Sequence, residues 1–283
     1  MSPLNVATCS NDSSSQRLAA ALATNWRFRA KRWAWGIGLA SVIVYAAYVS
    51  EILSFKLVQG LPKLGQALWL MLQPSGFDHL PEFAWALCET VAMAFLGTLL
   101  GSVCAVFLAL FCARTTFPLG FFRFGFRRIA DGFRTFDHLI WALVFVRAIG
   151  LGPIAGILAI ALVDAGNLAK LYSEAIDNSD PKPIEGVRAS GGSKLDGLCM
   201  GLLPQVLPNI LSTTLYMFES NTRSATILGI VGAGGIGYQL ADRLRVYEFG
   251  QASLMIIMII GVVYLIDMLS GSLRRMLIGR QGR

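Results

Sequence analysis

The chain has 283 residues, of which 55% are hydrophobic and only 14% charged, with a formal net charge of +7. A soluble domain usually carries about 25% charged residues, so this composition argues against a soluble globular protein and indicates one that sits in lipid. Several apolar stretches reach the roughly 20 residues that a helix needs to cross the hydrocarbon core of a bilayer.

The cysteines and histidines predict neither a disulfide framework nor a metal centre. The five cysteines are scattered, mostly within apolar runs, none belongs to a C-x-x-C pair, and the chain has only two histidines. A membrane-embedded enzyme would need clustered carboxylates and histidines, or a nucleophile beside a base. The sequence therefore disfavours catalysis by this chain.

The N-terminal third begins with a Ser- and Asn-rich tail at residues 1–32, which ends in a basic cluster. Residues 33–53 form the first candidate span, with Trp and Tyr residues of the kind found at membrane interfaces. No small-residue cleavage site accompanies this run, so we expect it to remain as an anchor. Residues 54–80 are mixed, and their apolar group at 68–72 is too short to span. We therefore expect a periplasmic segment that lies along the membrane surface.

Five further apolar runs are predicted to be transmembrane helices, at residues 83–113, 139–149, 154–163, 206–231 and 254–269. They predict an all-α transmembrane helix bundle of about six spans, with a core domain at residues 81–275 and a tail at 276–283. Gly97 and Gly101 have the G-x-x-x-G spacing that permits close helix contact. Between the second and third spans, residues 114–136 interleave Arg with Phe, which is typical of an amphipathic helix at the inner membrane surface.

The positive charges predict the orientation. On alternating sides of the six spans, 18 of the 24 Lys and Arg residues fall on one side and four on the other, and Arg147 and Arg223 lie within spans. Cytoplasmic loops carry the excess of Lys and Arg. Both termini and the long polar connection at residues 167–204 should therefore be cytoplasmic, in a multi-pass protein of a bacterial inner membrane.

That polar connection contains the motif that points to function. Residues 185–191 read E-G-V-R-A-S-G, and Leu203-Pro204 follows eleven residues later. This pattern predicts two short helices joined at a flexible glycine, with the first helix available to a partner protein. Its spacing resembles the E-A-A, G and L-P loop of permease subunits in binding-protein-dependent ABC importers of the type I, methionine-importer-like fold. Gly186 and Val187 replace two usual alanines, and Gly201 replaces a usual isoleucine.

The resemblance implies a mechanism. In such importers the loop docks into a groove of a separate ATPase, so residues 174–204 would form the coupling loop. ATP and Mg²⁺ would be held by two ATPase subunits, and this chain would bind no cofactor and no nucleic acid. A periplasmic binding protein would deliver substrate, and one docking loop per chain implies a homodimer. The coupling residues assigned by position are Glu185, Arg188, Ala189, Gly191, Leu203 and Pro204.

Three more segments, at residues 150–153, 170–176 and 218–225, resemble the phosphonate branch of these permeases, and the resemblance covers roughly residues 80–275. It implies phosphonate as substrate, with phosphite, hypophosphite or another small oxyanion as alternatives. Asp137 and His138 depart from it, since relatives often have Pro followed by an acid there. An alternative from another class is an ion-coupled secondary transporter, which would normally show internal repeats and more charge at the midplane.

Polar residues within the spans are candidates for the pathway. Glu219 and Arg223 stand at i and i+4 near the middle of the fifth span, where ionisable groups are costly unless paired or turned toward a cavity. Two interpretations stay open: a buried structural pair, or an Arg223 that faces the pathway and neutralises an anionic substrate while Glu219 holds it. The candidate pathway residues are Glu219, Asn221, Arg223 and Arg147. Arg147 and Asp164 could also pair or line a vestibule, and the same alternatives stay open for Glu89.

Two glycine-rich stretches look like nucleotide-binding motifs. Residues 232–237 satisfy G-x-G-x-x-G but follow an apolar helix rather than a strand, so they do not predict a dinucleotide site. We expect Gly232, Gly234, Gly235 and Gly237 to form a tight conformational turn before the last span. Residues 190–194 read S-G-G-S-K and lack the G-K-[ST] ending of a phosphate-binding loop, so this chain should not bind ATP.

Overall fold

The computed structural model describes residues 31–49, 55–114 and 120–278. Every regular element within these ranges is a helix, which confirms the all-α class. The chain divides into two compact units, residues 1–67 and residues 68–283. The predicted tails at 1–30 and 279–283 lie outside the described residues.

The first unit contains an N-terminal helix, Lys31–Val49, and most of helix α2, Phe55–Met71. The N-terminal helix is long and apolar enough to cross a membrane, as predicted, although residues 50–53 of the expected span lie outside the described residues. The mixed segment that we placed at residues 54–80 is largely the helix α2, which includes Pro62.

The second unit begins at Leu68. A turn at residues 73–76 is fixed to the last helix of the bundle. The backbone N–H of Ser75 donates to the carbonyl of Gly250 at 3.2 Å, and Gly76 adopts a positive φ of 86° beside the side chain of Gln251. These contacts join the end of the predicted periplasmic segment to the core.

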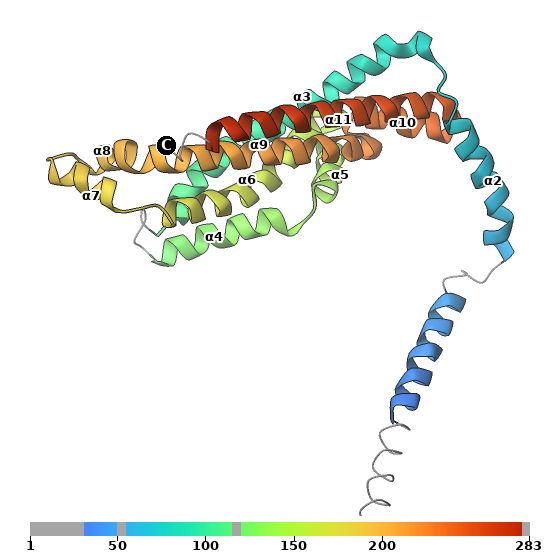
Figure 1. Ribbon diagram of the computed structural model, residues 1–283, viewed down its shortest axis with the longest axis horizontal. Coiled ribbons are helices and arrows are strands. Elements are labelled where there is room, and N and C mark those ends of the chain that lie inside the picture. Colours follow the sequence, from blue (N-terminus) through green and yellow to red (C-terminus); the bar gives the residue numbers. More distant parts are fainter. Residues whose placement is uncertain (1–30, 50–54, 115–119, 279–283) are drawn as a thin grey trace, which may run out of the picture. The chain divides into compact units, whose positions relative to one another are not determined.

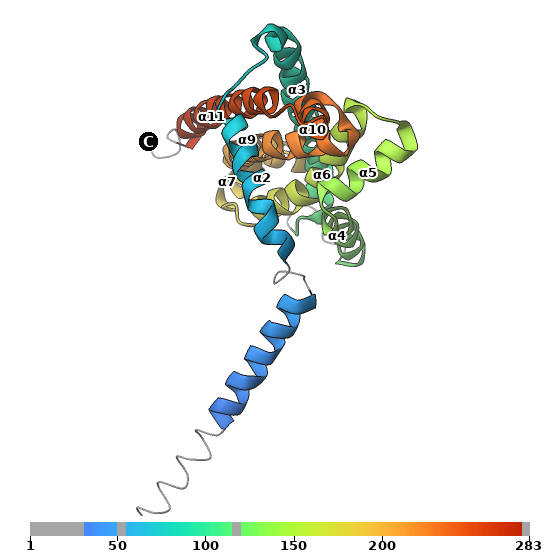
Figure 2. The ribbon, with the colours of Figure 1, turned by 90° about the vertical axis from the view of Figure 1, so that its right-hand side faces the viewer.

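The core is a bundle of long helices. The long helices of this bundle are α3 (Leu80–Cys112), α6 (Pro153–Asp177), α9 (Leu203–Leu228) and α11 (Phe249–Ile278), and Figure 1 shows α9 and α11 side by side. α3 contacts both α6 and α9, and α11 contacts α9. Figure 2 views this bundle more nearly end on, with α10 (Gly235–Arg245) near its centre.

Five helical segments are long and apolar enough to cross a membrane, in the part of the chain that the structure describes. They match five of the six predicted spans. The sixth, at residues 139–149, is the 12-residue helix α5 (His138–Ile149). At 1.5 Å per residue it covers about 18 Å, less than the roughly 30 Å of a bilayer core. It begins at the cap residue Asp137 and ends at Gly150, whose φ is 110°.

The predicted amphipathic helix at residues 114–136 is α4 (Gly120–Thr135). It packs against α6 and α3, and Figure 1 shows it running alongside α6. The contact is close because Gly166 of α6 has no side chain: a Cβ there would lie 2.6 Å from the carbonyl oxygen of Ala130. α4 is therefore packed on the bundle through this contact.

The G-x-x-x-G spacing makes the close contact that we predicted. A Cβ on Gly97 would lie 2.8 Å from the side chain of Ile160, and one on Gly101 would lie 2.9 Å from the carbonyl oxygen of Ala161. Because glycine lacks that atom, the backbones of α3 and α6 approach one another closely. The core around them forms three apolar clusters, which include Tyr172 near the end of α6, Ile160 at mid-bundle and Phe83 near the start of α3.

Candidate functional site

The predicted coupling loop forms two short helices joined by a turn, as the sequence indicated. Helix α7 (Lys182–Ala189) ends before Gly191, which adopts a positive φ of 92°. Ser193 and Asp196 then form a reciprocal capping box that starts helix α8 (Lys194–Asp196). Hydrogen bonds from the side chain and backbone of Ser193 lower the pKa of Asp196 below its ordinary value, because they favour the carboxylate.

The loop passes into the bundle without a break. α8 continues as η2 (Gly197–Leu202), a π-helical turn, and η2 continues into α9 at Leu203. The helical run from Lys194 to Ala233 is 40 residues long. α8, η2 and α9 therefore form one continuous helical connection between the loop and the bundle.

Gly201 explains one departure from the resembled loop. A Cβ on this residue would lie 2.8 Å from the Cα and 2.9 Å from the backbone nitrogen of Ile184 in α7. A side chain at position 201 would push α7 away from η2. At Gly186, in contrast, no atom lies within 4 Å of the place that a Cβ would occupy, so the first departure leaves the packing unaffected.

The residues assigned to coupling lie on an accessible surface. Glu185, Arg188 and Ala189 are accessible, and α7 contains no buried residue. Leu203 and Pro204 are also exposed at the start of α9, and Leu195 and Met200 are each 71% exposed nearby. This end of the molecule presents one polar helix beside several accessible apolar side chains.

Glu219 joins two arginines rather than one. Its Oε1 lies 3.6 Å from Nη2 of Arg223, the predicted i,i+4 partner, and its Oε2 lies 2.8 Å from Nη2 of Arg274 in α11. Charge counting had placed Arg274 only among the basic residues of the cytoplasmic side. The ion pair of Glu219 with Arg274 in the neighbouring helix is therefore shorter than its ion pair with Arg223 in the same helix.

A polar stripe on α9 was also missed. Its members are spaced by three or four residues and so lie on one helix face, although α9 lies in a run apolar enough to cross a membrane. Tyr216 and Arg223 are among its more accessible members, while Gln205 and Ser220 are partly buried. The 3.6-residue period could have revealed it. The stripe consists of Gln205, Asn209, Thr213, Tyr216, Ser220 and Arg223.

The stripe begins in a cavity of about 620 Å³ beside the coupling loop. Gln205, Asn209 and Thr213 line this cavity together with the end of α6, including Glu174, and the following turn. Gln205 also donates to the carbonyl of Gly201 at 2.6 Å. The polar face of α9 and the coupling loop are thus directly connected.

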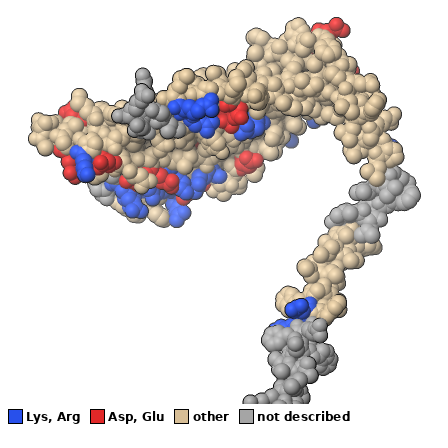
Figure 3. Space-filling model, viewed as in Figure 1, with Lys and Arg blue, Asp and Glu red and all other residues tan. Residues whose placement is uncertain are grey.

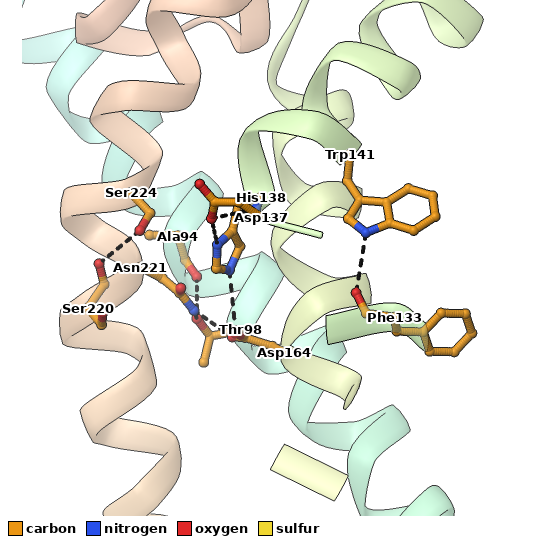
Figure 4. Close-up of polar contacts among 10 residues, drawn as sticks. All are labelled: Ala94, Thr98, Phe133, Asp137, His138, Trp141, Asp164, Ser220, Asn221 and Ser224. Carbon is orange, nitrogen blue, oxygen red and sulfur yellow. Dashed lines mark hydrogen bonds and ion pairs between the residues drawn. The ribbon is translucent and has the colours of Figure 1, made fainter. Parts of the chain in front are cut away.

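Asn221 lies on the opposite side of α9 from Glu219, because two residues correspond to a rotation of about 200°. It is 2% exposed, and its Nδ2 donates to Oγ1 of Thr98 at 2.8 Å and to Oδ2 of Asp164. Asp164 is fully buried. Figure 4 shows these side chains converging from α3, α6 and α9. The structure therefore separates Asn221 from its predicted companions Glu219 and Arg223.

His138 completes this buried cluster. Its Nε2 lies 3.8 Å from Oδ1 of Asp164, and its Nδ1 lies 3.3 Å from Oδ1 of Asp137, which also caps α5 (Figure 4). Among the described residues, neither His138 Nε2 nor Asp164 Oδ1 has a hydrogen-bond partner. The departure at Asp137-His138 thus places a group that can carry positive charge beside a buried carboxylate.

Arg147 and Asp164 are not brought together. Arg147 is exposed in the last turn of α5 and forms no ion pair within the described residues, while Asp164 contacts Asn221 and His138. Glu89 is partly buried beside the glycine turn, where its Oε1 would lie 3.1 Å from a Cβ on Gly234.

The glycine-rich segment forms a tight turn between α9 and α10, and no strand precedes it in the described chain. It starts with η3 (Gly229–Ala233), a π-helical turn, and Gly232, Gly234 and Gly235 have φ values of 104°, 82° and 68°. A Cβ on Gly237 would collide with the carbonyl oxygen of Thr226. Close backbone packing, rather than nucleotide binding, accounts for these glycines.

These features define a membrane-spanning transport subunit with an accessible helical loop at one end. The chain belongs to the family of binding-protein-dependent transport system inner membrane components, whose model matches residues 97–282. It is therefore a multi-pass inner-membrane component of an importer. Family membership favours this class over an ion-coupled secondary transporter.

Among its relatives is the putative phosphite transport system permease protein HtxC of Stutzerimonas stutzeri, 35% identical and covering 88% of each chain. The phosphate-import permease protein PhnE of Mycolicibacterium smegmatis is 38% identical over 77% of this chain and 41% of that protein. The putative cryptic phosphonate transport system permease protein PhnE2 of Escherichia coli is 48% identical over 42% of this chain and 97% of its own length.

A solved structure of the MetNI methionine ABC transporter in an inward-facing conformation has the same fold. It matches with a TM-score of 0.62 and 22% identity, over 72% of this chain and 99% of that chain. This likeness confirms the predicted type I importer permease fold.

Proposed function

We propose that the chain is the membrane-spanning permease subunit of an ATP-driven importer for phosphonate. The observation that carries the proposal is family membership combined with a coupling loop that continues directly into the polar-striped helix α9. Relatives named for phosphite, phosphate and phosphonate transport support a phosphorus oxyanion as the substrate class. Phosphite, hypophosphite and phosphate are the alternatives within that class.

A separate ATPase supplies the energy and holds ATP and Mg²⁺, and this chain is non-catalytic. α7 presents the accessible Glu185 to the ATPase, and η2 joins the loop to α9 in one continuous helical run. Closure of the ATPase on ATP would then displace α9 along its axis and rearrange the bundle. Arg188 and Ala189 complete the docking helix, and Gly191 permits the turn behind it.

The complex contains two copies of this chain, two ATPase subunits and a periplasmic binding protein. Each chain has one docking loop, so a pair of ATPases requires two chains related by a twofold axis. The described C-terminal end of α11 lies toward the coupling-loop end in Figure 1, which supports a cytoplasmic C-terminus. The excess of Lys and Arg supports a cytoplasmic N-terminus as well.

Growth of a deletion strain tests both the substrate and the coupling role. The strain receives phosphonate, phosphite or phosphate as sole phosphorus source and is complemented with wild type, Glu185→Ala or the control Glu82→Ala. Glu82 is also an accessible glutamate, but it lies in the first turn of α3. We expect rescue on phosphonate by wild type and Glu82→Ala only. Rescue by Glu185→Ala would remove the docking role, and rescue on phosphite alone would change the substrate.

A further inference from the structure

The group formed by Glu219, Arg223 and Arg274 carries more positive than negative charge. One carboxylate faces two guanidinium groups, so the group has a formal charge of +1. Figure 3 shows basic and acidic atoms gathered over the C-terminal end of α11 and the adjoining helix, with uncharged surface toward α10. A net charge within a bundle of apolar helices is costly unless it meets a counter-ion or water.

The geometry leaves the arginines available to a ligand. The Glu219 side chain is 10% exposed, whereas those of Arg223 and Arg274 are 50% and 29% exposed. The carboxylate therefore lies at the base of the group and the guanidinium groups lie nearer its surface. In the described chain, the buried Nε of Arg274 has no hydrogen-bond partner. Arg223 contacts Glu219 at 3.6 Å, which is longer than a hydrogen bond.

An aromatic ring lies beside one of the two guanidinium groups. The guanidinium carbon of Arg274 lies 5.8 Å from the centre of the Tyr216 ring, within the range of a cation–π contact. Tyr216 and Arg223 belong to the polar stripe of α9, and Ser220 lies between them. The arginines thus stand at the end of the stripe that begins beside the coupling loop.

We infer that Arg223 and Arg274 form an oxyanion site within the bundle that binds a tetrahedral phosphorus oxyanion. Two planar guanidinium groups from different helices present paired donors to such an anion, and Glu219 holds them in place while the site is empty. The inference rests on the proposed function and assigns a binding site that its substrate would occupy during transport. Glu219 competes with the ligand for the same donors, which would keep binding weak enough for release.

Binding to the purified full-length chain in lipid-free detergent micelles tests the site. Methylphosphonate, phosphite and sulfate are titrated, and the thermal shift and the phosphorus NMR line width are measured. We expect Arg223→Gln and Arg274→Gln to weaken methylphosphonate binding by about tenfold or more, the effect of losing a charge-assisted hydrogen bond. Arg275→Gln is the matched control, because Arg275 contacts Ser272 instead and should change affinity by less than about twofold.

Glu219→Gln separates a ligand site from a structural ion pair. If the carboxylate competes with the ligand, its removal tightens methylphosphonate binding, whereas loss of a purely structural pair weakens or does not change it. Unchanged binding in both arginine variants, or weaker or unchanged binding in Glu219→Gln, would overturn the inference. Elution of each variant as a single species in size-exclusion chromatography shows that it has folded.

A second arm distinguishes free oxyanion from a lipid headgroup, which has the same phosphate chemistry. Phosphatidylglycerol is added to the micelles and retained lipid is counted by native mass spectrometry. If wild type retains phosphatidylglycerol and the variants Arg223→Gln and Arg274→Gln do not, the site binds headgroups. If the lipid does not affect methylphosphonate binding, the site binds the free ion. If wild type rescues growth on phosphonate but the arginine variants bind methylphosphonate as well as wild type does, the site is rejected and the proposed function stands. If the variants show the expected loss of binding but wild type does not rescue growth, the site stands and the proposed function is rejected.

Discussion

The Nε2 atom of His138 lies 3.8 Å from Oδ1 of the fully buried Asp164. The two residues come from different helices, α5 and α6, and His138 also contacts Asp137 at the start of α5. A buried carboxylate requires hydrogen bonds and a compensating charge. Asn221 donates to Asp164 and to Thr98, and His138 lies beside Asp164, so the cluster connects four helices.

Charge compensation predicts coupling between His138 and Asp164. We expect His138→Leu to lower thermal stability strongly in an Asp164 background and much less in Asp164→Asn. The coupling free energy from the double-mutant cycle should be about 0.5–3 kcal/mol, as for residues in one network. Thermal unfolding of the purified variants measures it, with His79→Leu as control because the ion pair of His79 is with the exposed Glu82. Strict additivity would show that the pair does not interact.

Asn221 should be a stability residue. Asn221→Ala leaves Asp164 and Thr98 without their shared donor, and an unsatisfied buried polar group costs about 1–3 kcal/mol. The control is Asn209→Ala, because Asn209 is in the same helix but lines the open cavity. This change should alter the free energy of unfolding by less than about 0.5 kcal/mol. Denaturant titration compares the two. Equal effects would contradict the assigned role of the buried amide.

Gly201→Ile should impair coupling although isoleucine is usual in the resembled loop. The new side chain collides with the backbone of Ile184 and displaces α7 from η2. We expect less ATPase subunit to co-purify with the variant and ATP-driven uptake to fall. Gly186→Ala is the control, since that position is open and alanine favours a helix by roughly 0.5–1 kcal/mol. Normal ATPase recovery with Gly201→Ile would show that α7 tolerates displacement.

The capping box predicts a pH dependence. The pKa of Asp196 is lowered in the folded chain, so its carboxylate stabilises the loop above its unfolded pKa of about 3.9. This stabilisation is lost as pH falls through the lower, folded value. Unfolding of wild type and Asp196→Asn should therefore differ at pH 7 and converge toward pH 3. A difference that stays constant across this range would exclude the carboxylate as its cause.

Features that depend on residue spacing within one helix or one loop could be predicted from the sequence. The spacing of Glu185, Gly191 and Leu203-Pro204 located the two-helix loop, and Gly97 and Gly101 located a close contact. The i,i+4 rule found Arg223 as a partner of Glu219. The period of α9 also places Asn221 on the other face, so this separation could have been predicted.

Contacts between helices could not be predicted in the same way. Arg274 lies 55 residues from Glu219, and charge counting placed it on the cytoplasmic side because only its position along the chain was considered. His138 and Asp164 meet across the contact between α5 and α6. The close approach of Gly201 in η2 to Ile184 could be predicted only with knowledge of how α7 is placed.

The shortness of α5 has a consequence for biogenesis. A 12-residue apolar helix is below the range of about 17 to 25 residues that can partition into a bilayer as an independent unit. Near its two ends, Trp141 donates to the carbonyl of Phe133 at 3.2 Å, and Gly152 donates to that of Gly232 at 3.1 Å. Backbone groups at membrane depth need such partners. The translocon should therefore release α5 into lipid together with its neighbours, so that its insertion depends on helices synthesised later.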